Sequence, residues 1–113
     1  MKKTNITITG CMGRMGQQII KAAKKNKKFK IQSLTENKLI FKKIEGIKPQ
    51  LNTFDAFKNT DVIIDFTIPK CTLEVLKIAS KLNKRVVIGT TGFTKKEEGI
   101  IKFYSKKISI LKA

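Results

Sequence analysis

The sequence of 113 residues contains no histidine and no tryptophan, and it has only two cysteines and two prolines. Cys11 and Cys71 lie too far apart to form a zinc knuckle or a disulfide framework, and no histidine is present to help them bind a metal. No apolar run approaches the roughly 20 residues that cross a membrane, and the N-terminus lacks the apolar segment of a signal peptide. These absences predict a cytoplasmic protein with two reduced thiols, no metal site and no membrane partner.

Acidic residues are also scarce: 25 lysines and arginines face 8 aspartates and glutamates, a net charge of +17. A chain this basic attracts anions, so nucleic acid is the first partner to consider. However, 23 of the basic residues are lysines, and arginine, which makes bidentate contacts with bases and phosphates, occurs only at positions 14 and 85. The lysines are spread along the chain and accompany 17 isoleucines, which we interpret as a composition bias. The scarcity of arginine therefore argues against nucleic acid. The same positive charge would equally attract a phosphorylated small ligand.

The length allows one domain or part of a larger enzyme, but not two independently folded domains. Hydrophobic residues make up 41% of the chain, as is usual for a protein with a packed core. No repeat, low-complexity segment or Pro/Gly/Ser-rich linker interrupts the sequence. We therefore expect one continuous domain over residues 1–113.

The first third of the chain predicts a strand, a helix and a second strand. Residues 5–9 alternate polar and β-branched apolar side chains, which is typical of a strand. The helix that follows ends in a lysine cluster, and cations suit a helix C-terminus. Its spacing places four apolar residues on one predicted face: Met15, Ile19, Ala22 and Ala23. Residues 29–35 predict the second strand, which ends just before Glu36.

Residues 37–60 predict a loop with a short strand near 50–52 and a turn of helix at 53–58. Residues 62–66 are almost continuously apolar, as expected for a parallel strand covered on both faces. Pro69 suits the first turn of a helix that runs to about residue 83.

The last third predicts a strand at 86–88, a helix that begins with a capping box of Thr94 and Glu97, and a strand at 108–111. Strands that alternate with helices indicate a parallel sheet. The predicted fold class is therefore α/β, a Rossmann-like parallel sheet with helices on both faces.

Three glycines, separated by two residues each, lie between the first strand and the first helix. The motif consists of Gly10, Cys11, Met12, Gly13, Arg14, Met15 and Gly16. Glycine allows a tight turn and the close approach of a pyrophosphate to the backbone, and the helix start offers free N–H groups and partial positive charge. A tight turn alone would also use glycines, but the flanking strand and helix favour dinucleotide binding.

Glu36 follows Gly16 by twenty residues, at the end of the second predicted strand. A carboxylate at this place accepts hydrogen bonds from the hydroxyls of an adenosine ribose. The alternative is an ordinary exposed glutamate. A carboxylate disfavours a 2′-phosphate, but Arg14, Lys38 and the general positive charge offset this effect. NADH and NADPH therefore both stay candidate cofactors.

Small and hydroxyl-bearing residues follow two later strands. They are Phe66 and Thr67 after the third strand, and Gly89, Thr90, Thr91 and Gly92 after the fourth. Ligands of open α/β sheets bind along the carboxyl edge, so we expect these residues to join Gly10 and Glu36 there. A tight loop capped by hydroxyls is the alternative for residues 89–92. Asp65 is interpreted as a structural residue, because a carboxylate inside an apolar strand requires hydrogen bonds.

No pair of nucleophile and base stands out, because the chain has no histidine and neither cysteine has an evident base. The residues therefore predict a cofactor-binding chain without a catalytic residue of its own.

Three segments occur in the order found in one enzyme family. Residues 13–16 read Gly-Arg-Met-Gly, residues 61–69 read Asp-Val-Ile-Ile-Asp-Phe-Thr-Ile-Pro, and residues 87–93 read Val-Ile-Gly-Thr-Thr-Gly-Phe. Together they resemble the N-terminal, cofactor-binding domain of the 4-hydroxy-tetrahydrodipicolinate reductase (dihydrodipicolinate reductase) family. The resemblance covers nearly the whole chain and is weakest over residues 37–60.

The resemblance implies reduction of 4-hydroxy-tetrahydrodipicolinate by NADH or NADPH in lysine and diaminopimelate biosynthesis. For the full-length family it also implies a dicarboxylate substrate and a homotetramer. The glycine loop and Arg14 would hold the pyrophosphate, and Glu36, followed by Asn37, would meet the adenosine ribose. The remaining implied contacts are Phe66 and Thr67 in the dinucleotide groove, and Gly89, Thr90 and Thr91 at the nicotinamide ribose.

Two departures from the family pattern affect these expectations. Family members often carry an arginine after the ribose glutamate, whereas this chain has Asn37 and Lys38, so the choice between NADH and NADPH stays open. The family's substrate-binding and tetramerisation domain is absent from this chain, so we expect a cofactor-binding fragment that is inactive alone.

Three alternatives to the reductase stay open at this point. One is another nicotinamide-dependent dehydrogenase with the same sheet, similar to homoserine dehydrogenase. A second is a nucleotide-sensing or CoA-binding module, since a fold does not fix a function. The third is a basic nucleic-acid binder, whose affinity would fall steeply with salt.

Overall fold

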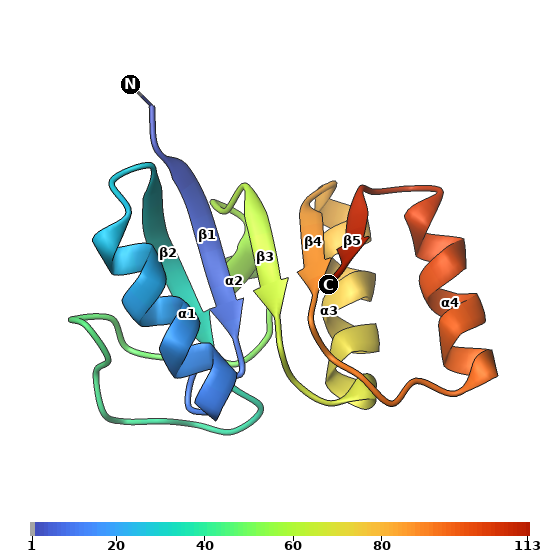
Figure 1. Cartoon of the computed structure of the whole chain (residues 1–113), viewed down its shortest axis with the longest axis horizontal. Coiled ribbons are helices and arrows are strands. Elements are labelled where there is room, and N and C mark those ends of the chain that lie inside the picture. Colours follow the sequence, from blue (N-terminus) through green and yellow to red (C-terminus); the bar gives the residue numbers. More distant parts are fainter. Residues whose placement is uncertain (1) are drawn as a thin grey trace.

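The computed structural model describes residues 2–113; Met1, the first residue of the predicted domain, lies outside the described residues. Strands and helices alternate along the chain (Figure 1). The strands are β1 (Thr4–Thr9), β2 (Phe29–Thr35), β3 (Val62–Asp65), β4 (Arg85–Ile88) and β5 (Ile110–Lys112). The helices are α1 (Arg14–Lys25), α2 (Phe54–Phe57), α3 (Pro69–Leu82) and α4 (Lys95–Ser105).

The five strands form one sheet in the order β2-β1-β3-β4-β5, and every neighbouring pair is parallel. This order and the alternating helices confirm the predicted Rossmann-like α/β fold. Because all strands run in the same direction, their carboxyl ends meet at one edge of the sheet, the lower edge in Figure 1. The chain reverses order after β2 and resumes next to β1 with β3, which creates a crevice at that edge where ligands of such folds bind.

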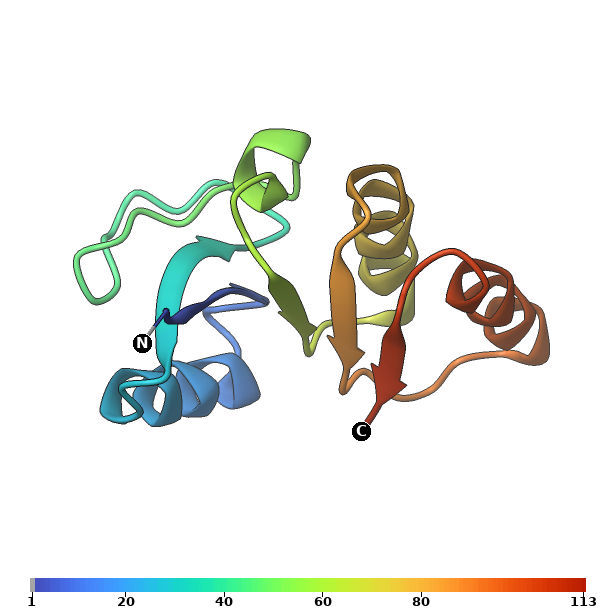
Figure 2. The ribbon, with the colours of Figure 1, turned by 90° about the horizontal axis from the view of Figure 1, so that it is seen from above.

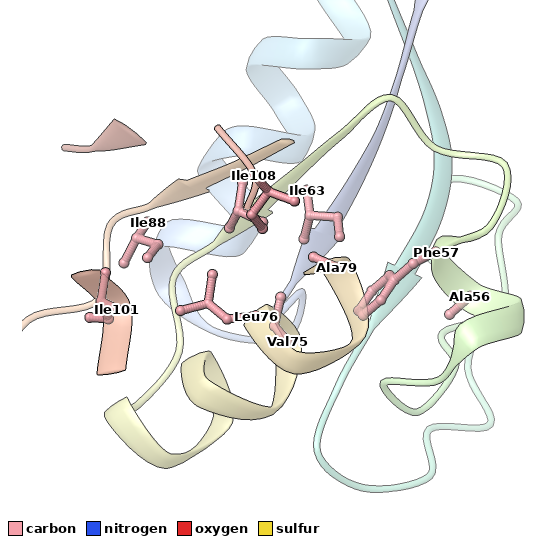
Figure 3. Close-up of a cluster of buried hydrophobic side chains, with 10 residues drawn as sticks. Ala56, Phe57, Ile63, Val75, Leu76, Ala79, Ile88, Ile101 and Ile108 are labelled. Atoms are coloured by element: carbon pink, nitrogen blue, oxygen red, sulfur yellow. The ribbon is translucent and has the colours of Figure 1, made fainter. Parts of the chain in front are cut away.

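Helices cover both faces of the sheet (Figure 2). On one face, α1 packs Ile20 and Ala23 against Ile8 of β1 and Leu34 of β2. On the other face lie α2 and α3, and α4 packs against α3. Figure 3 shows the core of this second face, where side chains from β3, β4 and three helices converge. Such two-sided burial explains why β3 is apolar along nearly all its length.

The buried face of α1 differs from the predicted one. Gly16, Ile20 and Ala23 are buried, whereas Met15 and Ala22 are exposed. The prediction was right for Ala23 and for half-buried Ile19, which packs against this core, and wrong for Met15 and Ala22. The reason is that Gly16, which has no side chain, is the residue that packs against the glycine loop. The hydrophobic pattern alone predicted Met15, and not Gly16, on the buried face of the helix.

Three other boundaries also shift. The predicted strand near 50–52 is reduced to a single bridge between Thr35 and Gln50. The third strand ends at Asp65, one residue before its predicted end. The last strand begins at Ile110 and not at Ile108, because Ile108 is buried in the core before the strand starts.

Within residues 2–113, no helix has the length and apolarity of a membrane span. In the same range, no three cysteine or acidic side chains are grouped as the ligands of a metal would be. Glycines and polar side chains gather instead at the carboxyl edge of the sheet, where the loops after β1, β2, β3 and β4 meet.

Candidate functional site

The glycine loop connects β1 to α1 at the carboxyl edge. Gly10 has a φ of +62°, in the left-handed region that glycine adopts without steric cost. A Cβ atom on Gly10 would also lie 2.8 Å from the carbonyl oxygen of Phe66 and 2.9 Å from Cγ2 of Thr67. Position 10 therefore requires glycine for two reasons, its backbone angle and its close contact with the loop after β3.

Gly13 and Gly16 close the loop onto the start of α1. The N–H of Gly13 donates to the carbonyl oxygen of Gly10 at 3.0 Å. A Cβ atom on Gly16 would lie only 2.2 Å from that same carbonyl oxygen, and one on Gly13 would lie 3.3 Å from it. The absence of side chains at these positions brings the backbone of the loop and the first turn of the helix into direct contact.

No side chain caps the N-terminus of α1 within the described part of the chain. Gly13 precedes the helix without a capping side chain, and its first turn contains no acidic residue. The start of α4 differs, because Thr94 and Glu97 form the predicted capping box there. The free N–H groups and the positive end of the α1 dipole therefore favour an anion supplied by a ligand.

Glu36 extends from the end of β2 to the glycine loop. One carboxylate oxygen accepts a hydrogen bond from the N–H of Met12 at 3.0 Å, and the other accepts one from the N–H of Asn37, also at 3.0 Å. The backbone N–H of Glu36 donates to the carbonyl oxygen of Gln50 at 2.9 Å, which fixes where β2 ends. The structure thus brings Glu36 and the glycine loop together, as the sequence predicts.

Gly89 lets the ring of Phe66 pack across the ends of β3 and β4. A Cβ atom on Gly89 would lie 1.8 Å from Cε1 of Phe66. The N–H of Gly89 donates to the carbonyl oxygen of Asp65 at 2.8 Å, and the N–H of Thr67 donates to Oγ1 of Thr90 at 2.8 Å. These contacts join the loops that follow the two strands.

Asp65 is fully buried, and its carboxylate accepts hydrogen bonds from four threonine hydroxyls. Its partners are Thr9 at 2.5 Å, Thr67 at 2.8 Å, Thr90 at 3.1 Å, and Thr72. The interpretation of Asp65 as a hydrogen-bonded structural residue is therefore confirmed. The carboxylate links the ends of β1, β3 and β4 to the first turn of α3.

A hollow of about 260 Å³ lies between the glycine loop, the end of β2 and the loop after β3. Six residues of the predicted site line it: Gly10, Gly13, Glu36, Asn37, Phe66 and Thr67. Three further residues that the sequence did not indicate also line it: Asn52, Ile68 and Cys71. The hollow occupies the crevice where β1 and β3 lie side by side.

The other predicted site residues lie outside this hollow. Gly16 packs against Gly10, and Gly89 packs against the ring of Phe66, so each supports a residue that lines the hollow. The side chains of Cys11 and Thr90 are buried, and that of Thr90 points to Asp65. Three predicted residues are exposed beside the hollow or along the edge: Arg14, Met15 and Thr91. Met12 contacts Glu36 through its backbone N–H.

The three residues that were missed differ in the signal they offered. Ile68 precedes Pro69, and Cys71 lies in the first turn of α3. The predicted start of this helix at the carboxyl edge could therefore have indicated both residues. Asn52 belongs to the region with the least regular pattern, and its place depends on the bridge between Thr35 and Gln50. That pairing joins distant residues, and no local spacing predicts it.

Both cysteines are buried thiols near Glu36. Burial, together with a smaller effect of the negative charge of Glu36, raises the pKa of Cys11 to about 11. Burial also raises the pKa of Cys71, with smaller contributions from Glu74, Asp65 and Glu36. Both groups therefore stay protonated at neutral pH, so neither has the thiolate character of a catalytic nucleophile.

The family comparison agrees with this geometry. Residues 4–113 match the family model described as "Dihydrodipicolinate reductase, N-terminus". The chain belongs to the dihydrodipicolinate reductase family. The resemblance noted in the sequence is therefore confirmed, and the match favours this family over the alternatives named above.

Two relatives in the family show how much of its length the chain represents. The chain is 68% identical to the 4-hydroxy-tetrahydrodipicolinate reductase of Pelagibacter ubique, in an alignment that covers 100% of this chain and 44% of that protein. It is 43% identical to the enzyme of the same name from Buchnera aphidicola, over 97% of this chain and 45% of that protein. The chain thus spans less than half the length of these dihydrodipicolinate reductase relatives.

Solved structures share the fold. The dipicolinate-bound dihydrodipicolinate reductase from Paenisporosarcina sp. TG-14 superposes with a TM-score of 0.79 at 23% identity, over 99% of this chain and 47% of that chain. A homoserine dehydrogenase from S. aureus gives a TM-score of 0.78 at 15% identity, over 99% of this chain and 32% of that chain. At these identities the likeness establishes the fold alone.

Proposed function

We propose that the chain binds the nicotinamide dinucleotide of a 4-hydroxy-tetrahydrodipicolinate reductase, the enzyme that reduces this substrate to tetrahydrodipicolinate. One observation carries the proposal: a glycine loop without room for side chains closes onto an uncapped helix start, and Glu36 stands directly beside it. A pyrophosphate suits this cradle because it needs close backbone approach, and the free N–H groups match its negative charge.

The proposed roles follow the layout of the hollow. The backbone of residues 10–16 and the exposed guanidinium of Arg14 hold the pyrophosphate. Glu36 and Asn37 lie on the side of the adenosine ribose. Phe66 and Thr67 line the groove in which the dinucleotide extends, and Gly89, Thr90 and Thr91 continue the edge toward the nicotinamide ribose. The bound NADH or NADPH supplies the hydride; the residues of this chain bind and orient the cofactor.

The dicarboxylate substrate and the homotetramer contacts belong, in this proposal, to the part of the relatives that extends beyond the matched length. This chain accordingly contains no catalytic residue and binds cofactor without reducing substrate. Measurable turnover by the 113-residue chain alone would overturn that part of the proposal.

The test is a calorimetric titration of the folded chain with NADPH and with NADH, in the wild type and in two glycine variants. Gly16→Ala places a Cβ atom where only 2.2 Å separates it from the carbonyl oxygen of Gly10. We expect this variant to lose binding by about tenfold or more, because the loop must move away from the helix start.

Gly99→Ala is the matched control, because a Cβ atom on Gly99 in α4 meets nothing within 4 Å. We expect it to bind like the wild type and to be slightly more stable, since alanine is the better helix former. Circular dichroism verifies that both variants are folded. If the folded wild type binds neither cofactor, or if Gly16→Ala binds as well as Gly99→Ala, the proposed site is wrong.

A further inference from the structure

A second hollow, of about 320 Å³, lies between α1 and residues 42–45. Its apolar floor contains Ile20 and Ile44, and three lysines line it: Lys21 from α1, and Lys42 and Lys43 from the segment between β2 and α2. Figure 2 shows that this segment extends from the outer edge of the sheet beside β2. None of the roles proposed above uses these lysines.

The charge of this hollow is positive. Glu45 is its acidic lining residue, and the carboxylate of Glu45 is already paired with the ammonium group of Lys24. The charges of Lys21, Lys42 and Lys43 are therefore not neutralised by Glu45. A concave surface lined by three lysines and by apolar side chains favours a compact anion, because ammonium groups form charge-assisted hydrogen bonds with anions.

Met12 connects this hollow to the candidate dinucleotide site. Met12 lines the lysine-bearing hollow, and its N–H donates to Oε2 of Glu36 at 3.0 Å. Its carbonyl oxygen accepts a hydrogen bond from Nε2 of Gln17 at 2.8 Å, and Gln17 lines the same hollow. Met12 thus borders both the hollow lined by the three lysines and the carboxylate proposed to meet the ribose.

Glu36 itself is held in a way that tolerates a neighbouring anion. Both of its carboxylate oxygens accept backbone N–H groups, from Met12 and from Asn37. These dipoles offset part of the negative charge that would otherwise repel a phosphate. A phosphate monoester carries a charge of about −1.5 to −2 at neutral pH, and three ammonium groups balance that charge readily.

We infer that the hollow formed by Lys21, Lys42 and Lys43 holds the 2′-phosphate of NADPH and makes NADPH the preferred cofactor. This inference rests on the proposed function, because it places the 2′-phosphate beside the ribose that Glu36 meets. It assigns the cofactor preference to residues 42–43 and α1 and not to the pair Asn37 and Lys38 that directly follows the glutamate.

The test compares the affinities of NADPH and NADH for the chain and for a double variant, Lys42→Gln with Lys43→Gln. The matched control is Lys27→Gln with Lys28→Gln, two adjacent exposed lysines in the turn between α1 and β2, at the amino end of β2. Both double variants lower the net charge equally, so an effect of the general field would appear in both. An ionic strength of about 0.15 M limits that field to roughly 8 Å.

We expect the wild type to bind NADPH more tightly than NADH. Lys42→Gln with Lys43→Gln should weaken NADPH by about tenfold or more and leave NADH within about twofold, because only NADPH carries the 2′-phosphate. The control pair should change neither affinity by more than about twofold. A single Lys38→Gln variant is expected to have no larger effect than the control.

Other results overturn the inference. Equal loss of NADPH in the variant and its control would assign the preference to net charge, and a loss confined to Lys38→Gln would assign it to the residues after Glu36. If NADH and NADPH bind the wild type equally and the double variant changes neither, the inference is wrong while the proposed function stands. If the wild type binds neither cofactor, the proposed function and the inference both fail.

Discussion

At the scale of single residues, the shape of the candidate site depends on packing and hydrogen bonds within the protein. Gly89 is needed because the ring of Phe66 occupies the space of its missing side chain. Asp65 is needed because four hydroxyls and three strand ends converge on its carboxylate. The hydroxyl of Thr90 donates to Asp65 and accepts the N–H of Thr67, so the buried charge also orients the backbone that borders the hollow.

The variant Asp65→Asn tests this arrangement. An amide replaces one acceptor oxygen with an NH₂ group, which would face two threonine hydroxyls that now donate to the carboxylate. We expect a loss of about 2–3 kcal/mol in the free energy of unfolding, because buried hydrogen-bonding groups lose their partners. Denaturant unfolding followed by circular dichroism measures the loss.

Asp61→Asn is the control for that experiment, because exposed Asp61 accepts one backbone N–H, from Asn5 at 2.8 Å. Asparagine keeps an acceptor oxygen for this bond, so we expect a loss of about 1 kcal/mol or less. Equal losses in the two variants would show that the buried network contributes no more than an exposed carboxylate does.

At the scale of elements, local signals predicted well where one residue type is physically required. The glycine loop, the capping box of α4 and the strand at 29–35 were all predicted at their observed places. The buried face of α1 was not, because the small size of Gly16 and not its hydrophobicity puts it inside. The position of Asn52 was not predicted either, because it follows from the pairing of Thr35 with Gln50.

Helices α1 and α4 both start at the carboxyl edge but differ in their caps, and Thr94→Ala tests the contribution of the cap of α4. In α4 the Oγ1 of Thr94 accepts the N–H of Glu97 at 3.1 Å, and the carboxylate of Glu97 accepts the N–H of Thr94 at 2.8 Å. We expect Thr94→Ala to lower the free energy of unfolding by about 1 kcal/mol. Gly13→Ala is no equivalent at α1, because Gly13 has no capping side chain to lose.

Thermal or urea unfolding of Thr94→Ala and of Ser109→Ala provides the measurement, since Ser109 is an exposed hydroxyl residue outside any helix. We expect Ser109→Ala to stay within about 0.5 kcal/mol of the wild type. A Thr94→Ala variant as stable as Ser109→Ala would mean that the capping box adds nothing to the stability of α4.

At the scale of the whole molecule, charge is the dominant property. A net charge of +17 on 113 residues is far from neutral, and the sequence alone establishes this. The ion pairs that the described residues form, Lys24 with Glu45 and Lys58 with Asp55, join exposed side chains. Exposed pairs contribute little, so repulsion among the lysines outweighs the attractive contacts.

Salt should therefore stabilise this protein. Screening weakens the repulsion among the lysines more than it weakens two exposed ion pairs, so we expect the midpoint of thermal unfolding to rise between about 0.01 M and 0.2 M sodium chloride. The chloride series separates screening from site binding if it is compared with NADPH at constant salt. Screening acts on every lysine, and its effect on the midpoint should saturate once the Debye length falls below the spacing of the charges. NADPH should raise the midpoint further at each salt concentration, in proportion to the logarithm of the NADPH concentration. A midpoint that falls as chloride is added would show that attractive pairs, and not repulsion, govern the electrostatics of the fold.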